Sequence, residues 1–191
     1  MTRRDEPTRC WWAGSDPLMV AYHDEEWGEP VHDDVRLFEM LTLEGFQAGL
    51  SWLIILRKRE AFRAAFRGFE PEVVAAFDDA DRARLLADAG IVRNRAKVDA
   101  TIGNARALLE LADSEGSFDA YLAARVPQPP AALPATATWE DLRPTTPVSD
   151  ALSRDLKKQG FRFVGSTIVY SFMEAVGLVD DHLPGCFRYR G

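Results

Sequence analysis

The spacing of the apolar residues is the feature of this 191-residue chain that most limits its fold. Segment after segment places them three and four positions apart, as on one face of an α-helix. No stretch of any length alternates apolar and polar residues as a half-buried strand does, and no internal repeat is found. A mainly α fold is therefore predicted, and the length is typical of one domain or of two small ones sharing a core.

Residues 33–67 predict two helices separated by a bend. Asp33 is a good N-cap, and Leu37, Met40 and Leu41 follow it in helical spacing. Two glycines within 45–50 interrupt the pattern, so a short bendable stretch is expected there before a second helix that reaches Phe66.

Residues 71–112 predict three further helical segments. The first begins at Pro71, the second covers 81–87, and the third covers 98–112. The last two are joined by a short turn that Gly90 opens and that ends at Asn94, a candidate N-cap.

The last third of the chain predicts an irregular connection and then two helices. Six of the eleven prolines fall within 127–147, which favours an extended connection over a helix. Ser149 or Asp150 is then expected to cap a helix that ends at Gly160, and a very apolar, buried helix is expected over 163–178.

The charge is acidic overall but unevenly distributed. Acidic residues outnumber basic ones by 30 to 23, for a net charge of −7, which excludes a uniformly basic surface for nucleic acid but allows a basic face. One basic group, 57–67, has a solvated helix face as its default interpretation. The other contains Arg93 and Lys97 at the start of a helix, where side chains and backbone N–H groups together suit a phosphate.

The termini give no sign of export or membrane insertion. The first ten residues carry three arginines but lack the apolar core of a secretory signal, and no apolar run approaches the ~20 residues of a membrane helix. A reducing cytoplasm is expected, where a disulfide between Cys10 and Cys186 would be unusual.

The cysteines and histidines gather at the two ends of the chain. There are only two cysteines, which excludes a disulfide-stapled scaffold and a four-cysteine zinc site. Cys10 and His23 near the start, with His182 and Cys186 near the end, could form a closed tetrahedral set of the kind that binds structural zinc. The alternative is that the cysteines are small buried hydrophobes and the histidines ordinary core or surface residues.

Glu44 is a candidate functional acid. It follows Leu37, Met40 and Leu41 by seven, four and three positions, which places it on their apolar stripe. A carboxylate in a core is costly unless it meets a cation or hydrogen-bond donors. The alternatives are that the helix has already ended at Glu44 or that an arginine neutralises it.

Large aromatic residues are abundant in the same part of the chain. They usually form core, but aromatic faces with a carboxylate can also hold a flat cationic heterocycle by stacking, cation–π attraction and a charge-assisted hydrogen bond. These residues are Trp11, Trp12, Tyr22, Trp27, Phe38, Phe46 and Trp52.

Together these residues form a pattern that resembles the 3-methyladenine DNA glycosylase I family, a divergent, zinc-binding branch of the helix-hairpin-helix DNA glycosylases. The resemblance runs from about Arg9 to Cys186. Its motifs are Arg9-Cys10 with Trp12, YHDEEWG at 22–28, LEGFQAGLSW at 43–52, DAGIVR at 88–93, GFRFVG at 160–165, and Asp181-His182.

The resemblance implies a helix-hairpin-helix DNA glycosylase fold whose terminal segments are pinned by one structural zinc ion. It implies that Cys10, His23, His182 and Cys186 are the four zinc ligands. One glycosylase unit would span 1–191, with a helical hairpin subregion at about 71–125. A zinc-binding subregion would combine about 9–68 with about 149–191.

The resemblance also implies base excision from double-stranded DNA. A monofunctional hydrolase would flip 3-methyladenine out of the duplex and release it, leaving an abasic site. Glu44 would be the catalytic or base-recognising acid. Tyr22 and Trp52 would stack on the base, and Trp12 and Trp27 would line the pocket.

The chain is expected to be a monomer that does not associate with a membrane. Further residues are implied to contact the DNA. Gly49 and Leu50 would fill the gap in the duplex, while Gly90, Arg93 and Lys97 would bind phosphates at the hairpin. The competing hypothesis is a zinc-pinned module that recognises lesions without cleaving them, and such a module would not require Glu44.

Overall fold

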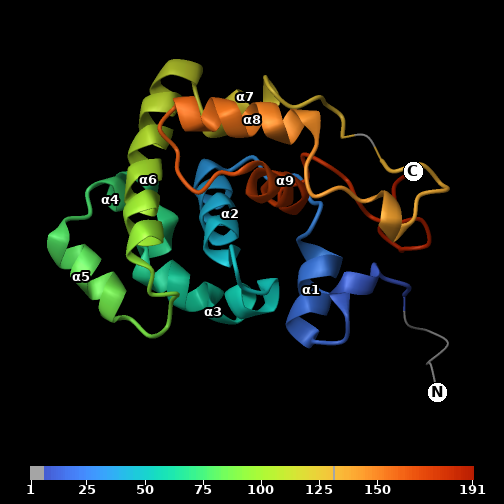
Figure 1. Ribbon diagram of the computed structural model, residues 1–191, viewed down its shortest axis with the longest axis horizontal. Helices are drawn as coiled ribbons and strands as arrows, with labels where there is room; N and C mark the ends of the chain where they lie inside the picture. The colour runs from blue at the N-terminus through green and yellow to red at the C-terminus, as the bar shows by residue number, and fades with distance from the viewer. Residues whose placement is uncertain (1–6, 131) are drawn as a thin grey trace.

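The computed structural model describes residues 7–130 and 132–191, and α-helices dominate them (Figure 1). No strand is formed there, and the single isolated bridge joins Ala132 to Asp180. None of the described helices is both long and apolar enough to cross a membrane. The helices are α1 (Pro17–Glu25), α2 (Asp34–Gln47), α3 (Trp52–Ala65), α4 (Pro71–Ala75), α5 (Asp79–Ala87), α6 (Arg95–Glu115), α7 (Phe118–Ala123), α8 (Pro147–Lys158) and α9 (Ser166–Ala175).

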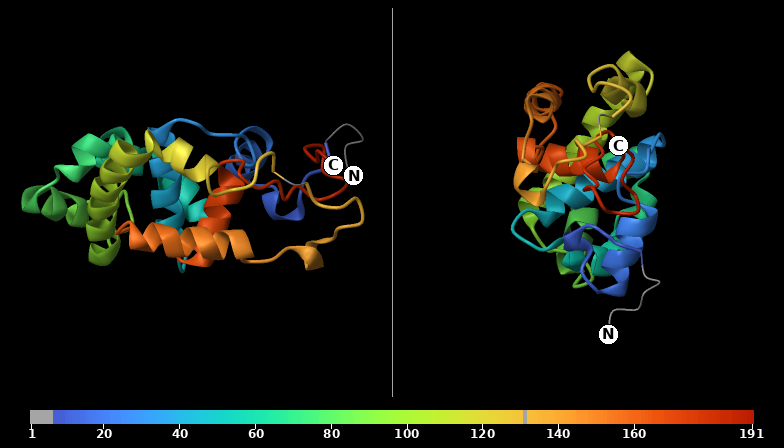
Figure 2. Two further views of the ribbon diagram at one scale, coloured as in Figure 1. Left: turned by 90° about the horizontal axis from the view of Figure 1, so that it is seen from above. Right: turned by 90° about the vertical axis from the view of Figure 1, so that its right-hand side faces the viewer.

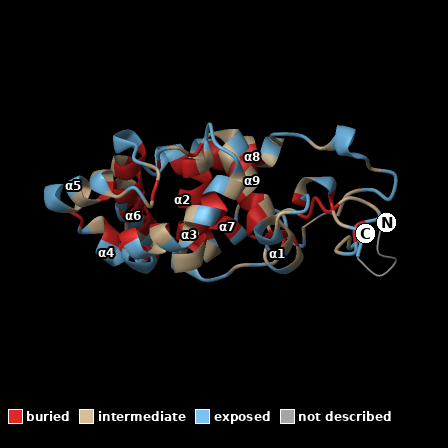
Figure 3. Ribbon diagram, turned by 90° about the horizontal axis from the view of Figure 1, so that it is seen from below, coloured by how far each residue is buried: buried red, intermediate tan, exposed pale blue. Residues whose placement is uncertain are grey.

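Helix α2 is the centre of the fold, and its neighbours are α3, α6, α7 and α9 (Figures 1 and 3). Asp33 caps it as predicted, accepting a 2.9 Å hydrogen bond from the backbone N–H of Arg36. The predicted interruption at Gly45 is wrong, because α2 continues to Gln47. A Cβ at Gly45 would lie 3.6 Å from the Cβ of Phe163, an ordinary van der Waals distance, so the packing here neither requires a glycine nor ends the helix.

The hairpin between α5 and α6 has the predicted form. Asp78 begins α5 with a capping box, and Asn94 begins α6 by accepting a 3.1 Å hydrogen bond from the backbone N–H of Lys97. The turn packs on α3, where Lys58 Nζ donates to the carbonyls of Ala89 and Gly90 at 2.9 and 3.0 Å.

The last two helices differ from the prediction at their starts. Helix α8 is capped by Thr146, not by Ser149 or Asp150, because Pro147 suits the first helical position and Ser149 completes a capping box with Thr146. Helix α9 is shorter than predicted and begins only at Ser166, since Phe163 has a left-handed φ of 55°. The described residues of 127–146 form a short 3-10 turn at Trp139–Asp141 and the bridge at Ala132 but no α-helix, as expected of a proline-rich connection.

The segments that precede α1 and follow α9 lie together at one end of the elongated molecule (Figure 2). The backbone N–H of Phe187 donates a 2.9 Å hydrogen bond to the carbonyl of Thr8. The opposite end contains α4, α5 and the lower part of α6 (Figure 1).

Candidate active site and metal cluster

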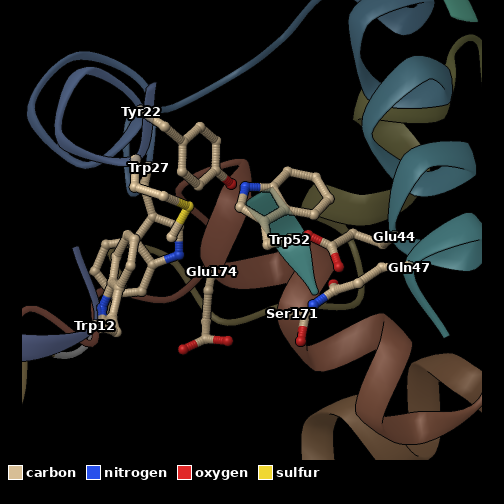
Figure 4. Close-up of a pocket in the computed structure, with 9 residues that line it drawn as sticks. Trp12, Tyr22, Trp27, Glu44, Gln47, Trp52, Ser171 and Glu174 are labelled. Atoms are coloured by element: carbon tan, nitrogen blue, oxygen red, sulfur yellow. The ribbon is translucent and has the colours of Figure 1, made fainter. Parts of the chain in front are cut away.

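A cavity of about 270 Å³ lies between α1, the start of α3, the end of α2 and α9 (Figure 4). It brings together Glu44 and all four aromatic residues that were predicted to bind a base. Its lining residues are Trp12, Met19, Tyr22, Trp27, Glu44, Gln47, Trp52, Ser171 and Glu174.

The aromatic side chains form two adjoining pairs on the cavity wall. The ring centroids of Tyr22 and Trp52 are 5.3 Å apart, and those of Trp12 and Trp27 are 4.9 Å apart with an edge-on geometry. The Nε1 atom of Trp52 is buried and has no hydrogen-bond partner among the described residues. The wall therefore offers aromatic faces to a flat ligand.

Glu44 lies in the last turn of α2 and is only 5% exposed. Burial raises the pKa of its carboxyl from 4.5 to about 8. The helix has not ended at Glu44, and no described lysine or arginine forms an ion pair with it, so neither alternative interpretation holds. Glu39 on the same helix differs, because Arg36 and Arg63 each contact its carboxylate at 2.8 Å.

The sequence prediction missed a second carboxyl in this cavity. Glu174 on α9 also lines it, and burial, together with the nearby carboxyls of Asp181 and Glu44, raises the pKa of Glu174 well above 4.5. A lone carboxylate in an apolar helix was the signal used for Glu44, and the same signal was present at Glu174. Gln47 and Ser171 carried no comparable signal.

Cys10, His23 and Cys186 form a buried cluster that could hold a metal ion. One ligand atom from each lies within 4.8 Å of the others, and both cysteines are free thiols. His182 lies beside this group of three but outside it, with its ring centroid 5.4 Å from that of His23.

Both histidines are oriented as metal ligands usually are. His23 Nδ1 bonds to Asp24 at 2.8 Å, and His182 Nδ1 bonds to Asp180 at 2.7 Å. His23 Nε2 lies 3.4 Å from Cys186 Sγ, whereas His182 Nε2 is buried without any hydrogen-bond partner among the described residues. Carboxylates that fix one ring nitrogen and leave the other for a metal are common partners of ligating histidines, so these residues fit a metal site.

The metal cluster and the cavity share a wall. The ring of Trp12 packs 5.2 Å from that of His23, and the ring of Trp27 packs 4.5 Å from that of His182. Gly28 has a left-handed φ of 79°, and a Cβ there would lie 2.8 Å from the His182 ring. The tryptophans of the cavity therefore rest on His23 of the cluster and on His182 beside it.

The predicted DNA-contacting loop borders the cavity. Gly49 has a φ of 86°, and Leu50 is an exposed apolar residue between α2 and α3. Both line a neighbouring hollow of about 180 Å³ that shares Glu44, Gln47 and Ser171 with the cavity.

The three hairpin residues predicted to bind phosphates, Gly90, Arg93 and Lys97, differ in whether they are free to do so. Arg93 is exposed, and the backbone N–H of Gly90 is bonded to Asp88 Oδ1 at 2.7 Å. Lys97 is buried, and its Nζ donates to the carbonyls of Phe46 and Ala48 at 3.0 and 2.9 Å. The prediction that Lys97 contacts a phosphate is therefore corrected, because its ammonium is already bonded to the end of α2.

The fold and the site define a helical-hairpin protein with an aromatic cavity. The cavity contains two carboxyls that form no ion pair with a described lysine or arginine, so it is suited to a flat, positively charged ring. The comparisons with known proteins agree with this class. The Methyladenine glycosylase family matches residues 12–189, and the chain belongs to that family.

Individual relatives match the chain over nearly its whole length. DNA-3-methyladenine glycosylase 1 of Escherichia coli (strain K12) is 51% identical over 183 residues, covering 96% of this chain and 97% of the relative. A crystal structure of 3-methyladenine DNA glycosylase I superposes with a TM-score of 0.92 at 49% identity, covering 96% of this chain and 100% of that one. A variant of a 3-methyladenine DNA glycosylase I in complex with 3-methyladenine gives a TM-score of 0.88 at 38% identity, covering 95% and 99%.

Proposed function

We propose that the protein releases 3-methyladenine from double-stranded DNA by hydrolysing its N-glycosidic bond. The observation that carries this proposal is Glu44, a buried carboxyl in an aromatic cavity that pairs with no lysine or arginine of residues 7–130 and 132–191. Methylation at N3 gives adenine a positive charge and weakens its bond to the sugar. The leaving base then needs little acid catalysis, and selection of the cationic base becomes the main task.

The cavity residues would divide this task between them. Tyr22 and Trp52 would stack on the flipped base, with Trp12 and Trp27 behind them. A cationic base near Glu44 would favour its ionised form, giving a charge-assisted interaction at a carboxyl that pairs with no described lysine or arginine. A neutral base would gain no such interaction.

The reaction proposed is hydrolysis without a covalent amine intermediate. A lyase needs an amine nucleophile, and the chain has only four lysines, none of which lines the cavity. Lys97 and Lys58 donate to backbone carbonyls, and Lys158 pairs with Asp155. Borohydride trapping of an enzyme–DNA adduct would contradict the assignment.

One structural zinc ion per chain would be held by Cys10, His23, His182 and Cys186. Such an ion would supply no chemistry to the cavity; it would tie the first and last segments together and so support Trp12 and Trp27.

On the DNA side, Gly49 and Leu50 would fill the gap left by the flipped base. Backbone amides near Gly90 and the side chain of Arg93 would bind phosphates. The two free thiols are compatible with a reducing cytoplasm.

The decisive experiment measures free base released from methylated duplex DNA. Glu44→Gln should reduce release about 100-fold or more, because the new side chain cannot carry the charge that faces the base. Glu39→Gln is the matched control, since Glu39 lies on the same helix but is neutralised by Arg36 and Arg63. It should retain release within about threefold once folding is verified. Undetectable release by the wild type would overturn the enzyme assignment and favour a lesion-binding module.

A further inference from the structure

Lys97 joins the hairpin to the loop that borders the cavity. It lies in the first turn of α6, directly after the hairpin, and its backbone N–H bonds to the capping residue Asn94. Its side chain runs inward and is only 8% exposed. There Nζ donates to the carbonyls of Phe46 and Ala48, which lie 51 and 49 positions earlier in the chain.

These two hydrogen bonds provide donors for backbone carbonyls at the C-terminal end of α2. The last carbonyls of a helix have no intrahelical partners and form the negative end of its dipole, so a buried helix end requires donors from elsewhere. The interior lowers the pKa of Lys97, which reflects the cost of placing an ammonium there. Two carbonyls at the negative end of α2 offset part of that cost.

The loop that follows these carbonyls has few other anchors. The backbone N–H of Leu50 bonds back to the carbonyl of Gln47, which holds the loop only to α2 itself. Ser51 begins α3 without a side-chain cap, and Gly49 has a φ of 86°. Lys97 is thus the contact from α6 that fixes Ala48, the residue directly before Gly49 and Leu50.

We propose that Lys97 is a positioning residue that fixes the distance and orientation of loop 48–51 relative to the hairpin. The hairpin would then bind the phosphates of a duplex while the loop inserts Leu50 at the matching position of the same duplex. The proposal rests on the proposed function and assigns Lys97 a role in flipping the base rather than in holding it. Lys97 is not one of the residues that line the cavity, and its side chain is largely shielded from solvent. A defect at Lys97 should therefore separate flipping from binding of the free base.

The test compares Lys97→Met with Arg106→Met. Arg106 is the matched control because it lies on the same helix and also donates to the last carbonyl of a helix, Ala75 of α4, at 2.8 Å, but far from the loop. A duplex with an abasic analogue opposite 2-aminopurine reports insertion of Leu50 through the fluorescence of 2-aminopurine. Quenching of tryptophan fluorescence reports binding of free 3-methyladenine.

Lys97→Met should lose most of the 2-aminopurine change and lower base release about tenfold or more. It should bind free 3-methyladenine and an undamaged duplex within about twofold of the wild type. Arg106→Met should match the wild type in all four measurements. Lys97→Arg keeps the donors and should recover part of the insertion signal; it also provides the test if the methionine variant does not fold.

Two outcomes would overturn the proposal. One is an insertion signal and a release rate equal to those of the wild type, which would show that the loop needs no anchor from α6. The other is a parallel loss of free-base binding, which would show that Lys97 supports the cavity as a whole. Absence of base release by the wild type is a separate result, because it counts against the proposed function and not against the coupling of loop and hairpin.

Discussion

The cavity with its metal cluster and the hairpin perform their proposed tasks with different parts of the chain. In the first region the side chains provide the chemistry: carboxyls and indole rings line the cavity, and the indole rings pack on the imidazoles beside the thiols. In the second region the backbone provides it, and side chains such as Lys58 and Asp88 hold that backbone in shape. Substitutions should therefore have large effects in the first region and small, graded ones in the second.

The largest effect is expected where the cluster supports the cavity. His182→Ala would remove a proposed ligand and the ring on which Trp27 packs. We expect loss of bound zinc, a loss of about 4 kcal/mol or more in the free energy of unfolding, and a fall in Tm of about 10 °C. Binding of free 3-methyladenine should fall in parallel. Elemental analysis, thermal melting and fluorescence quenching measure these quantities.

His32→Ala provides the control because it removes the remaining histidine, which is exposed and bonded to Asp119 at 3.0 Å. It should change the free energy of unfolding by less than about 1 kcal/mol. Full zinc content and an unchanged Tm in His182→Ala would restrict the metal site to the group formed by Cys10, His23 and Cys186.

The contrast between a site built from side chains and a site built from backbone explains why the sequence predicted the first in more detail than the second. The cysteines, histidines, tryptophans and a carboxylate on an apolar stripe are candidates from the sequence, and the resemblance to the glycosylase family is what assigned them to a base pocket and a zinc site. The structure brings Glu44 into one cavity with Tyr22 and Trp52, although these residues come from three helices. The hairpin was predicted only in outline, from Gly90 and the N-cap Asn94.

Two of the errors came from positions where tertiary packing decides the outcome. Gly45 resembles a helix breaker, but α2 packs against α3, α6, α7 and α9 and continues through this glycine to Gln47. Lys97 resembles a surface charge, because the sequence does not show that the unpaired carbonyls of Phe46 and Ala48 lie within its reach. The hydrogen bonds of Lys97 span 51 and 49 positions of sequence, where local periodicity carries no information.

A second, intermediate effect concerns the pH dependence of stability. The pKa of Glu44 is about 8 in the folded protein and near 4.5 in the unfolded chain, so the folded state binds the extra proton between these values. The unfolding free energy should therefore fall as pH rises from about 5 to 8. Glu44→Gln does not titrate, and its stability relative to the wild type should increase over this range by up to about 4 kcal/mol.

Urea unfolding of both proteins at several pH values between 5 and 8 measures this difference. Two curves that stay parallel across the range would show that Glu44 is already ionised in the folded state, and the cavity would then carry a permanent negative charge. A gap that widens with pH supports a neutral carboxyl that ionises when a cationic base arrives.

The smallest effect is expected at the hairpin, from a single exposed charge. Arg93→Ala should weaken binding to undamaged and damaged duplexes alike, by about two- to fivefold, and should lower the slope of log K against log salt by about one. The control is Arg143→Ala, which removes an exposed charge from the proline-rich connection. Fluorescence titrations at several salt concentrations measure both slopes. A loss confined to damaged duplex would place Arg93 with the cavity residues, since a phosphate contact cannot distinguish a methylated base that lies outside its reach.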